Sequence, residues 1–237
     1  MLVAAAVCPC PPLLVPEVAA GAAPELDAAR AACTDALGVL AASRPDRLVV
    51  VGPADSAGPE VYPRGARGSF RGFGVDVEVY LGADSGGAEV TELPHGLAVG
   101  AWLLGRTGWA DAPVDVIGVG DGLSAERCAA VGRDVAAQAG RTALLVLGDA
   151  SACRTLKAPG YLDERAAPFD AEVGRAMETA DPAALAALDP GLARELKASG
   201  RAPWQVLAGA AGDSDLGGSL LYEDAPYGVG YLVATWS

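Results

Sequence analysis

The residues of this chain that could do chemistry gather in a few short segments, each at the end of an apolar run. They are Cys8, Cys10, Asp55, Asp149, Ser151 and Glu223. Carboxylates bind hard cations or move protons, and thiolates bind softer metals. In an open α/β sheet the ligand crevice lies beyond the carboxyl ends of the strands. We therefore take these six residues as the candidate pocket.

The segment Cys8-Pro9-Cys10 has two interpretations. Two cysteines that flank a proline are poorly placed for a mutual disulfide. A metal site built on both thiolates needs further ligands, and the neighbouring sequence supplies none. Packing in a loop or in the core is the alternative, and it is the interpretation that the spacing favours.

Asp149 and Ser151 follow the apolar run 143–147. A carboxylate there could orient a ligand or hold a cation, but an aspartate after a strand also commonly caps the next turn through its own backbone. Ser151 has no neighbouring histidine or lysine that would make it a nucleophile, and the pattern G-x-S-x-G is absent. These features argue against a serine hydrolase.

Two other patterns invite a ligand and have simpler explanations. Asp55, Asp149 and Glu223 could converge on Mg²⁺, which accepts all-oxygen ligands, yet Glu223 also suits the start of a solvated turn. The glycine-rich segment 118–122 lies between a predicted strand and a predicted helix. It lacks the G-x-G-x-x-G order and the lysine of a phosphate loop, so we expect a tight turn there.

The elements that must position these residues follow from hydrophobic periodicity. Strands are predicted at 2–7, 46–51, 75–80, 114–119, 143–147, 219–223 and 228–236. Helices are predicted at 24–42, 95–104, 124–139, 166–179, 182–187, 190–197 and 202–211. Buried strands that alternate with helices indicate a three-layer α/β/α sandwich around a mixed, mostly parallel sheet, with a C-terminal antiparallel hairpin. We expect a single α/β domain over residues 1–237.

Charge and composition narrow the class of partner. The chain carries 17 Lys and Arg against 30 Asp and Glu, a net charge of −13 that repels nucleic acid and anionic membrane surfaces. The apolar start lacks a basic leader region and stops at Pro9, so we expect a first strand rather than a signal peptide. Five cysteines without a secreted-scaffold pattern predict a reducing compartment, the cytoplasm.

Five segments, in this order, resemble a known family. They read CPCPPLLVP, LVVVGPAD, LVLGDASA, GYLDERAAPFD and YEDAPYGVGYLVA. Together they resemble the class III extradiol ring-cleavage dioxygenase superfamily, the LigB-like proteins. The resemblance implies a central mixed sheet flanked by helices. It also implies an Fe(II) site made of two histidines, from the loops after the first two strands, and a glutamate, with a further histidine as acid/base.

This chain departs from that pattern at each histidine position. Cys10 stands at the first ligand position, Ala54 or Asp55 at the second, and Ala152 at the acid/base position. The chain's one histidine, His95, falls at a predicted helix start, outside the strand-end loops, where a capping or partly exposed residue is expected. One histidine cannot restore a site of two. The resemblance with these departures implies that ring-cleaving Fe(II) chemistry has been lost.

We therefore expect a degenerate LigB-like homologue that binds a small molecule or a protein and needs no cofactor. An enzyme with repurposed chemistry of oxidoreductase or hydrolase type in the same crevice is one alternative, with a divalent metal on non-histidine ligands as its variant. A regulatory or structural subunit is another, and it would expose an apolar patch. A homo-oligomer of this chain is also possible on the sequence.

Overall fold

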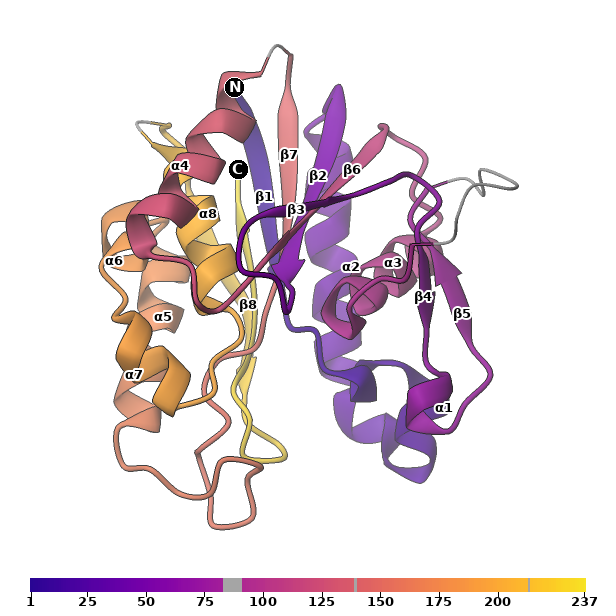
Figure 1. Ribbon diagram of the computed structural model, residues 1–237, viewed down its shortest axis with the longest axis vertical. Coiled ribbons are helices and arrows are strands. Elements are labelled where there is room, and N and C mark those ends of the chain that lie inside the picture. Colours follow the sequence, from indigo (N-terminus) through magenta and orange to yellow (C-terminus); the bar gives the residue numbers. More distant parts are fainter. Residues whose placement is uncertain (83–90, 139, 213) are drawn as a thin grey trace.

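A seven-stranded sheet forms the centre of the computed structural model, which describes residues 1–82, 91–138, 140–212 and 214–237 (Figure 1). Its strand order is β3-β6-β2-β7-β1-β9-β8. The strands are β1 (Leu2–Cys8), β2 (Arg47–Pro53), β3 (Glu60–Tyr62), β6 (Val114–Val119), β7 (Thr142–Leu147), β8 (Gly218–Asp224) and β9 (Tyr231–Trp236). Strands β6, β2, β7 and β1 are parallel, whereas β3 and β9 run antiparallel to their neighbours. The predicted mixed sheet and its C-terminal antiparallel hairpin, β8–β9, are confirmed.

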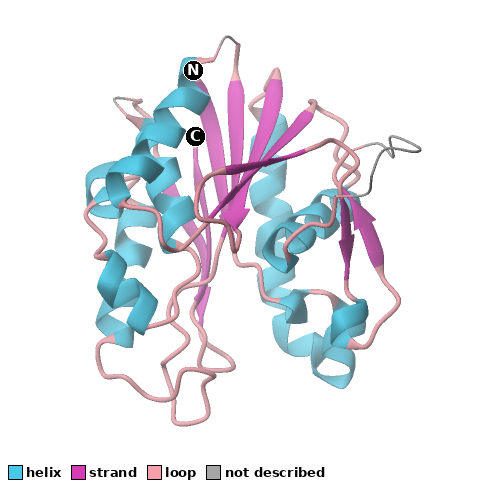
Figure 2. Ribbon diagram, in the orientation of Figure 1, coloured by secondary structure: helices cyan, strands magenta, loops and turns pink. Residues whose placement is uncertain are grey.

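Helices cover both faces of this sheet, which makes three layers (Figure 2). The longer helices are α2 (Asp27–Ala42), α3 (His95–Thr107), α4 (Ala125–Ala137), α5 (Ala166–Glu178) and α8 (Arg201–Ala211). The short ones are α1 (Pro16–Ala19), α6 (Pro182–Ala186), α7 (Pro190–Glu195) and the 3-10 turns at Pro12–Leu14, Ala20–Leu26 and Arg71–Phe73. Figure 1 shows α2 and α3 on one face and α4 to α8 on the other. The predicted three-layer sandwich is therefore confirmed.

The central strands are continuously apolar because both of their faces are buried. In β1, Ala5 and Val7 pack into the core under α4, α5 and α8, while Ala4, Ala6 and Cys8 pack into the core under α2 and α3. All six residues of β7 are buried. The alternation of side chains along a strand thus divides one apolar run between two cores.

The segment between Gly52 and Arg71, for which no strand or helix is predicted, holds two strands of three residues each. Strand β3 pairs with the edge strand β6, and β4 (Arg67–Ser69) pairs with β5 (Glu78–Tyr80) in a separate two-stranded sheet. The strand predicted at 75–80 is shortened to β5. Runs of three residues carry no measurable periodicity, so the sequence pattern could not find them.

Helix starts agree with the predictions both with and without a side-chain cap: α6 and α7 begin as predicted with one, and α3 and α5 begin as predicted without one. The Ser124 side chain accepts the N–H of Arg127 and so caps the start of α4. The predicted end of this helix at residue 139 lies outside the described residues. Within the part of the chain that is described, no helix is both long enough and apolar enough to cross a membrane.

Two glycines allow α4 and α8 to pack backbone against backbone. A Cβ atom at Gly132 would fall on the carbonyl oxygen of Val206, and one at Gly209 would fall on the backbone of Ala129. Because α8 also packs on β2 and β7, this close approach decides how near α4 lies to the sheet. These glycines are required because the two helix backbones touch at their positions. They are unfavourable for the helices themselves, because glycine has a low helix propensity.

The substitution Gly132→Ala should separate α4 from α8 and lower the free energy of unfolding by about 1–3 kcal/mol, because a tightly packed contact would be overfilled. Urea denaturation followed by circular dichroism measures this. Gly38→Ala is the matched control: Gly38 is an exposed residue inside α2 with no atom within 4 Å of its Cβ position. This change should stabilise the protein by up to about 1 kcal/mol through helix propensity alone. Equal effects at the two positions would contradict the packing argument.

Candidate functional site

A cavity of about 640 Å³ lies beyond the carboxyl ends of β1, β2 and β7. We call it the strand-end cavity. Its walls come from the loop 10–13 after β1, the loop 53–55 after β2, the loop after β7 with Asp149 and Ala152, the start of α3 at 94–96, the segment 190–201 and the approach to β9 at 227–231. The position of this cavity is the one that the strand-end rule for α/β sheets indicates.

The structure brings three of the six candidate pocket residues together. Cys10, Asp55 and Asp149 line the strand-end cavity, whereas the other three do not. Cys8 lies at the buried end of β1, where its thiol interacts with that of Cys33 on α2, and the interaction raises the pKa of Cys8. Cys8 is thus a core residue, as the packing interpretation expects.

Asp149 ties the loops of the cavity to one another. Its Oδ1 accepts the backbone N–H of Cys10 at 2.8 Å. Its own N–H donates to Ser199 Oγ at 2.9 Å, and its carbonyl oxygen accepts the N–H of Gly200 at 2.9 Å. The alternative that Asp149 caps its own turn is therefore wrong, because the carboxylate bonds to a loop 139 residues away in sequence.

Burial governs the chemistry of Asp149 and Cys10. Desolvation raises the pKa of Asp149 from 3.8 to about 7, and the hydrogen bond from Cys10 N–H opposes this only in part. Burial, followed by the charge of Asp149, raises the pKa of the Cys10 thiol well above its usual value. At neutral pH, Cys10 is a neutral thiol and a poor nucleophile. Asp149 populates both its protonated and its ionised form at this pH.

Ser151 belongs to a buried structural cluster instead of the cavity. Its N–H and hydroxyl donate to the two carboxylate oxygens of Asp170 at 2.8 and 2.9 Å, and the Arg154 guanidinium pairs with the same carboxylate at 2.9 Å. Asp170 is 1% exposed and anchors the loop after β7 to α5. Asp170 is the last residue of the segment GYLDERAAPFD, which the sequence analysis singled out. Its role could not be recognised there, because it depends on a contact with Ser151, 19 residues earlier.

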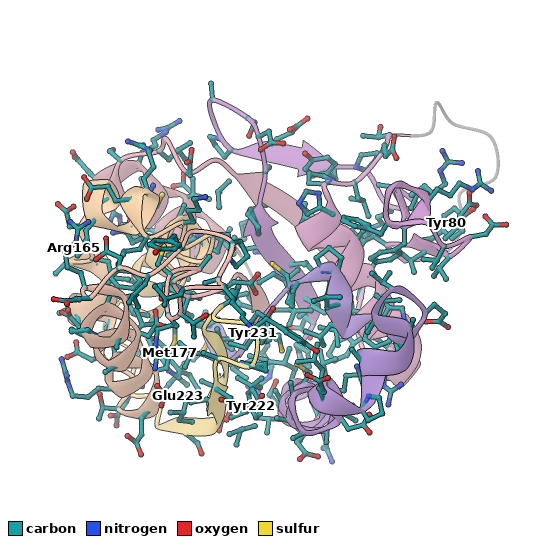
Figure 3. The ribbon with its side chains drawn as sticks, turned by 90° about the horizontal axis from the view of Figure 1, so that it is seen from below. Tyr80, Arg165, Met177, Tyr222, Glu223 and Tyr231 are labelled. Atoms are coloured by element: carbon teal, nitrogen blue, oxygen red, sulfur yellow. The ribbon has the colours of Figure 1, made fainter. Side chains whose placement is uncertain are left out.

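Glu223 does not reach the strand-end cavity. It lies within β8, paired with Leu232 of β9, and its carboxylate faces Gly174 of α5. In Figure 3 it lies on the outer strand, away from Tyr231 near the middle of the view. Asp55, Asp149 and Glu223 therefore do not converge on a cation site, and the alternative of a turn that starts at Glu223 is wrong, because the strand continues through Asp224. The described residues contain no cluster of three or more His, Cys, Asp or Glu suited to a metal ion.

His95 lies closer to the cavity than the sequence indicated. It is the first residue of α3, as expected, but this helix start lines the strand-end cavity. A Cβ atom at Gly96 would lie 2.8 Å from Pro53 and 3.3 Å from the Cys10 Sγ, so the missing side chain lets α3 approach the two strand-end loops. The exposed imidazole packs edge to face against Phe73, with ring centroids 5.9 Å apart.

Sequence reasoning missed the cavity residues that come from α7, α8 and the start of β9. Lys197 and Arg201 line the cavity from one side, and Tyr231 lines it from the sheet. Burial and the charge of Asp149 raise the pKa of the Tyr231 hydroxyl, so this phenol stays protonated. No motif marks these residues, because their place depends on how the outer helices dock.

The raised pKa of Asp149 predicts a pH-dependent stability. Between its ordinary pKa of 3.8 and the folded value of about 7, the native state holds more protons than the unfolded state. The free energy of unfolding should therefore fall as the pH rises through this window, by an amount on the order of 2–4 kcal/mol. Asp149→Asn keeps an oxygen acceptor for Cys10 N–H and should be more stable than the wild type at pH 8. Chemical denaturation from pH 4 to 8 measures the slope of the free energy of unfolding against pH for the wild type and for Asp149→Asn.

Asp55→Asn is the matched control for this experiment, because the Asp55 carboxylate is exposed on the same cavity. It should leave the slope of stability against pH unchanged. If Asp149→Asn has the same slope as the wild type, Asp149 is ionised throughout the range and the burial argument fails.

Comparisons with known proteins show the fold and nothing finer. No family model matches this sequence, and no curated protein matches it. Among solved structures, the chain is similar to the crystal structure of the uncharacterized protein JW3007 from Escherichia coli K12, with a TM-score of 0.59 and 15% sequence identity. The match covers 99% of this chain and 100% of that one. The α/β architecture is thus shared with another protein over its whole length.

Proposed function

We propose that this protein is a LigB-like homologue that has lost the Fe(II) site and binds a small organic molecule in the strand-end cavity. One observation carries the proposal. The positions at which the resemblance expects histidines are Cys10, Ala54 or Asp55, and Ala152, and all of them line this one cavity. Residues that are separated by more than 140 positions in the chain thus meet where the resemblance expects one site, and none of them is a histidine.

The donor set does not fit a two-histidine, one-carboxylate iron site. Ala54 and Ala152 offer no ligand atom, and the raised pKa of Cys10 keeps its thiol protonated. His95 provides a single imidazole on a different element, α3. Fe(II) oxygenases hold the metal on one face with two imidazoles and a carboxylate, so the residues present lack the basis for that chemistry.

The cavity is suited to a ligand without a metal. Its volume of about 640 Å³ falls in the range of small-molecule sites, roughly 300–1,000 Å³. Pro11, Pro12 and Leu13 make one wall apolar, while Asp149 and Tyr231 offer hydrogen-bonding groups. A mainly apolar surface with a few convergent polar groups is what distinguishes such sites from the remaining surface.

Fragment binding followed by NMR tests this function. Amide shifts from binding fragments should cluster at residues that line the strand-end cavity. The substitution Ala152→Phe fills part of the cavity and should weaken fragment binding by at least about tenfold, a loss near 1.4 kcal/mol. Ala41→Phe, on the surface groove between α2 and α3, is the matched control and should leave binding unchanged.

Two results would contradict the proposal. Fragments that bind only outside the strand-end cavity would move the function elsewhere on the fold. Binding that survives Ala152→Phe in a folded variant, as judged by circular dichroism, would show that this cavity is not the site.

Asp149 favours a second candidate function, an enzyme with repurposed acid–base chemistry in the same cavity. A carboxyl group whose pKa lies at about 7 is suited to proton transfer at neutral pH. In that case Asp149→Asn should lower turnover of a bound substrate by about 100-fold or more while the substrate still binds. Turnover that persists in the variant would reject this candidate.

We further propose the cytoplasm as the site of action. All five cysteines lie in the described part of the chain and are free thiols, which is compatible with a reducing compartment. The net charge of −13 argues against nucleic acid and anionic membranes as partners.

A further inference from the structure

One side of the strand-end cavity is cationic although the chain as a whole is acidic. Arg194 of α7, Lys197 after it and Arg201 at the start of α8 line this side, and we call them the cationic wall. The three residues fall within a stretch of eight in a chain with 17 Lys and Arg over 237 residues. A local concentration of positive charge against the sign of the net charge points to a negatively charged ligand.

Within the described residues, one of these three charges forms an ion pair with a carboxylate. Arg194 pairs with Asp121 at 3.7 Å. In the described part of the chain, Lys197 and Arg201 form no ion pair with any carboxylate. Arg201 is 2% exposed, and its two terminal nitrogens donate to the carbonyl oxygens of Leu123 and Asp121 and to Gln205 Oε1. Its Nε–H has no hydrogen-bond partner within the described residues.

Lys197 holds its place on the cationic wall in an unfavourable backbone conformation. It occupies the position after the last turn of α7, where its φ is +56° and glycine is the usual residue. Its Nζ donates to the carbonyl oxygen of Pro159 at 3.3 Å, the one hydrogen bond of this ammonium within the described residues. A non-glycine residue held at positive φ beside a cavity points to a role for its side chain.

The other two carboxylates of the cavity do not cancel these charges. Asp55 follows β2, on the side of the cavity formed by the loop 53–55, and its carboxylate is exposed to solvent. Asp149 is partly protonated at neutral pH because burial raises its pKa to about 7. Lys197 therefore keeps a charge that no carboxylate of the described residues pairs, while Arg201 shares the attraction of the exposed Asp121 with Arg194.

The opposite side of the cavity decides what kind of anion fits. Pro11, Pro12, Leu13, Pro53 and Pro94 form an apolar surface there. The glycine-rich turn at 118–122 offers no phosphate cradle, because a Cβ atom at Gly120 would fall on the carbonyl oxygen of Ser56. A ligand with a compact apolar body and one carboxylate matches both sides.

We propose that the strand-end cavity binds a small organic acid, with its carboxylate on Lys197 and Arg201 and its apolar body against the proline residues. This rests on the proposed small-molecule function and adds the chemical class of the ligand. Lys197 is the specificity-determining residue, because its flexible ammonium is exposed at the cavity, whereas Arg201 also holds the loop 121–123 to α8.

The test compares two probes of equal shape, cyclohexanecarboxylate and cyclohexanecarboxamide, by NMR titration of the full chain, with cyclohexyl phosphate as a third probe. The carboxylate should bind at least about tenfold more tightly than the neutral amide, as expected for charge-assisted hydrogen bonds. Lys197→Gln should remove this preference without weakening amide binding, and Lys197→Arg should retain it. Arg44→Gln is the matched control, since Arg44 also has a positive φ, +47°, but lies at the opposite end of the sheet, just before β2.

Five outcomes decide the proposal. A preference for the carboxylate that Lys197→Gln abolishes and Arg44→Gln leaves intact supports it. Equal binding of the two probes, or a preference that survives Lys197→Gln, overturns it while leaving the small-molecule function intact. Tighter binding of cyclohexyl phosphate than of the carboxylate overturns the assignment to carboxylic acids. Absence of binding by both probes overturns it as well, and only a failed fragment screen in addition removes the function itself.

Discussion

The hydrogen bond from Cys10 N–H to the Asp149 carboxylate is the interaction on which the strand-end cavity depends. At 2.8 Å it joins the loop after β1 to the loop after β7, two segments 139 residues apart in the chain. The backbone of Asp149 also bonds to Ser199 and Gly200 at the start of α8. One residue therefore connects three walls of the cavity, at the cost of placing a carboxyl group where burial disfavours its charge.

The proposed loss of an Fe(II) site requires a scaffold that holds its shape without a metal. Asp170 holds the loop after β7 from beneath through Ser151 and Arg154, and Gly96 lets α3 close on Pro53. None of these contacts uses an atom at Ala54 or Ala152. The cavity is supported by hydrogen bonds and packing that are independent of a metal, which is compatible with the proposed change of chemistry on a retained fold.

Much of the fold could be predicted from the sequence, since strands such as β1 and β7 are continuous apolar runs bounded by Gly and Pro. The strand-end rule then placed Cys10, Asp55 and Asp149 correctly at one cavity. It failed for Glu223, because the chain positions of β8 and β9 do not reveal which strand lies at the sheet edge. The rule also could not find Lys197 and Arg201, whose side chains reach the cavity through the docking of α7 and α8.

Metal content measures the central claim most directly. Protein purified without a tag should contain substoichiometric iron and zinc by mass spectrometry, and anaerobic addition of Fe(II) or Zn(II) followed by gel filtration should leave it so. Stoichiometric metal that survives gel filtration, and that is lost in Cys10→Ser or Asp149→Asn, would contradict the account and assign the strand-end cavity to metal chemistry on non-histidine ligands.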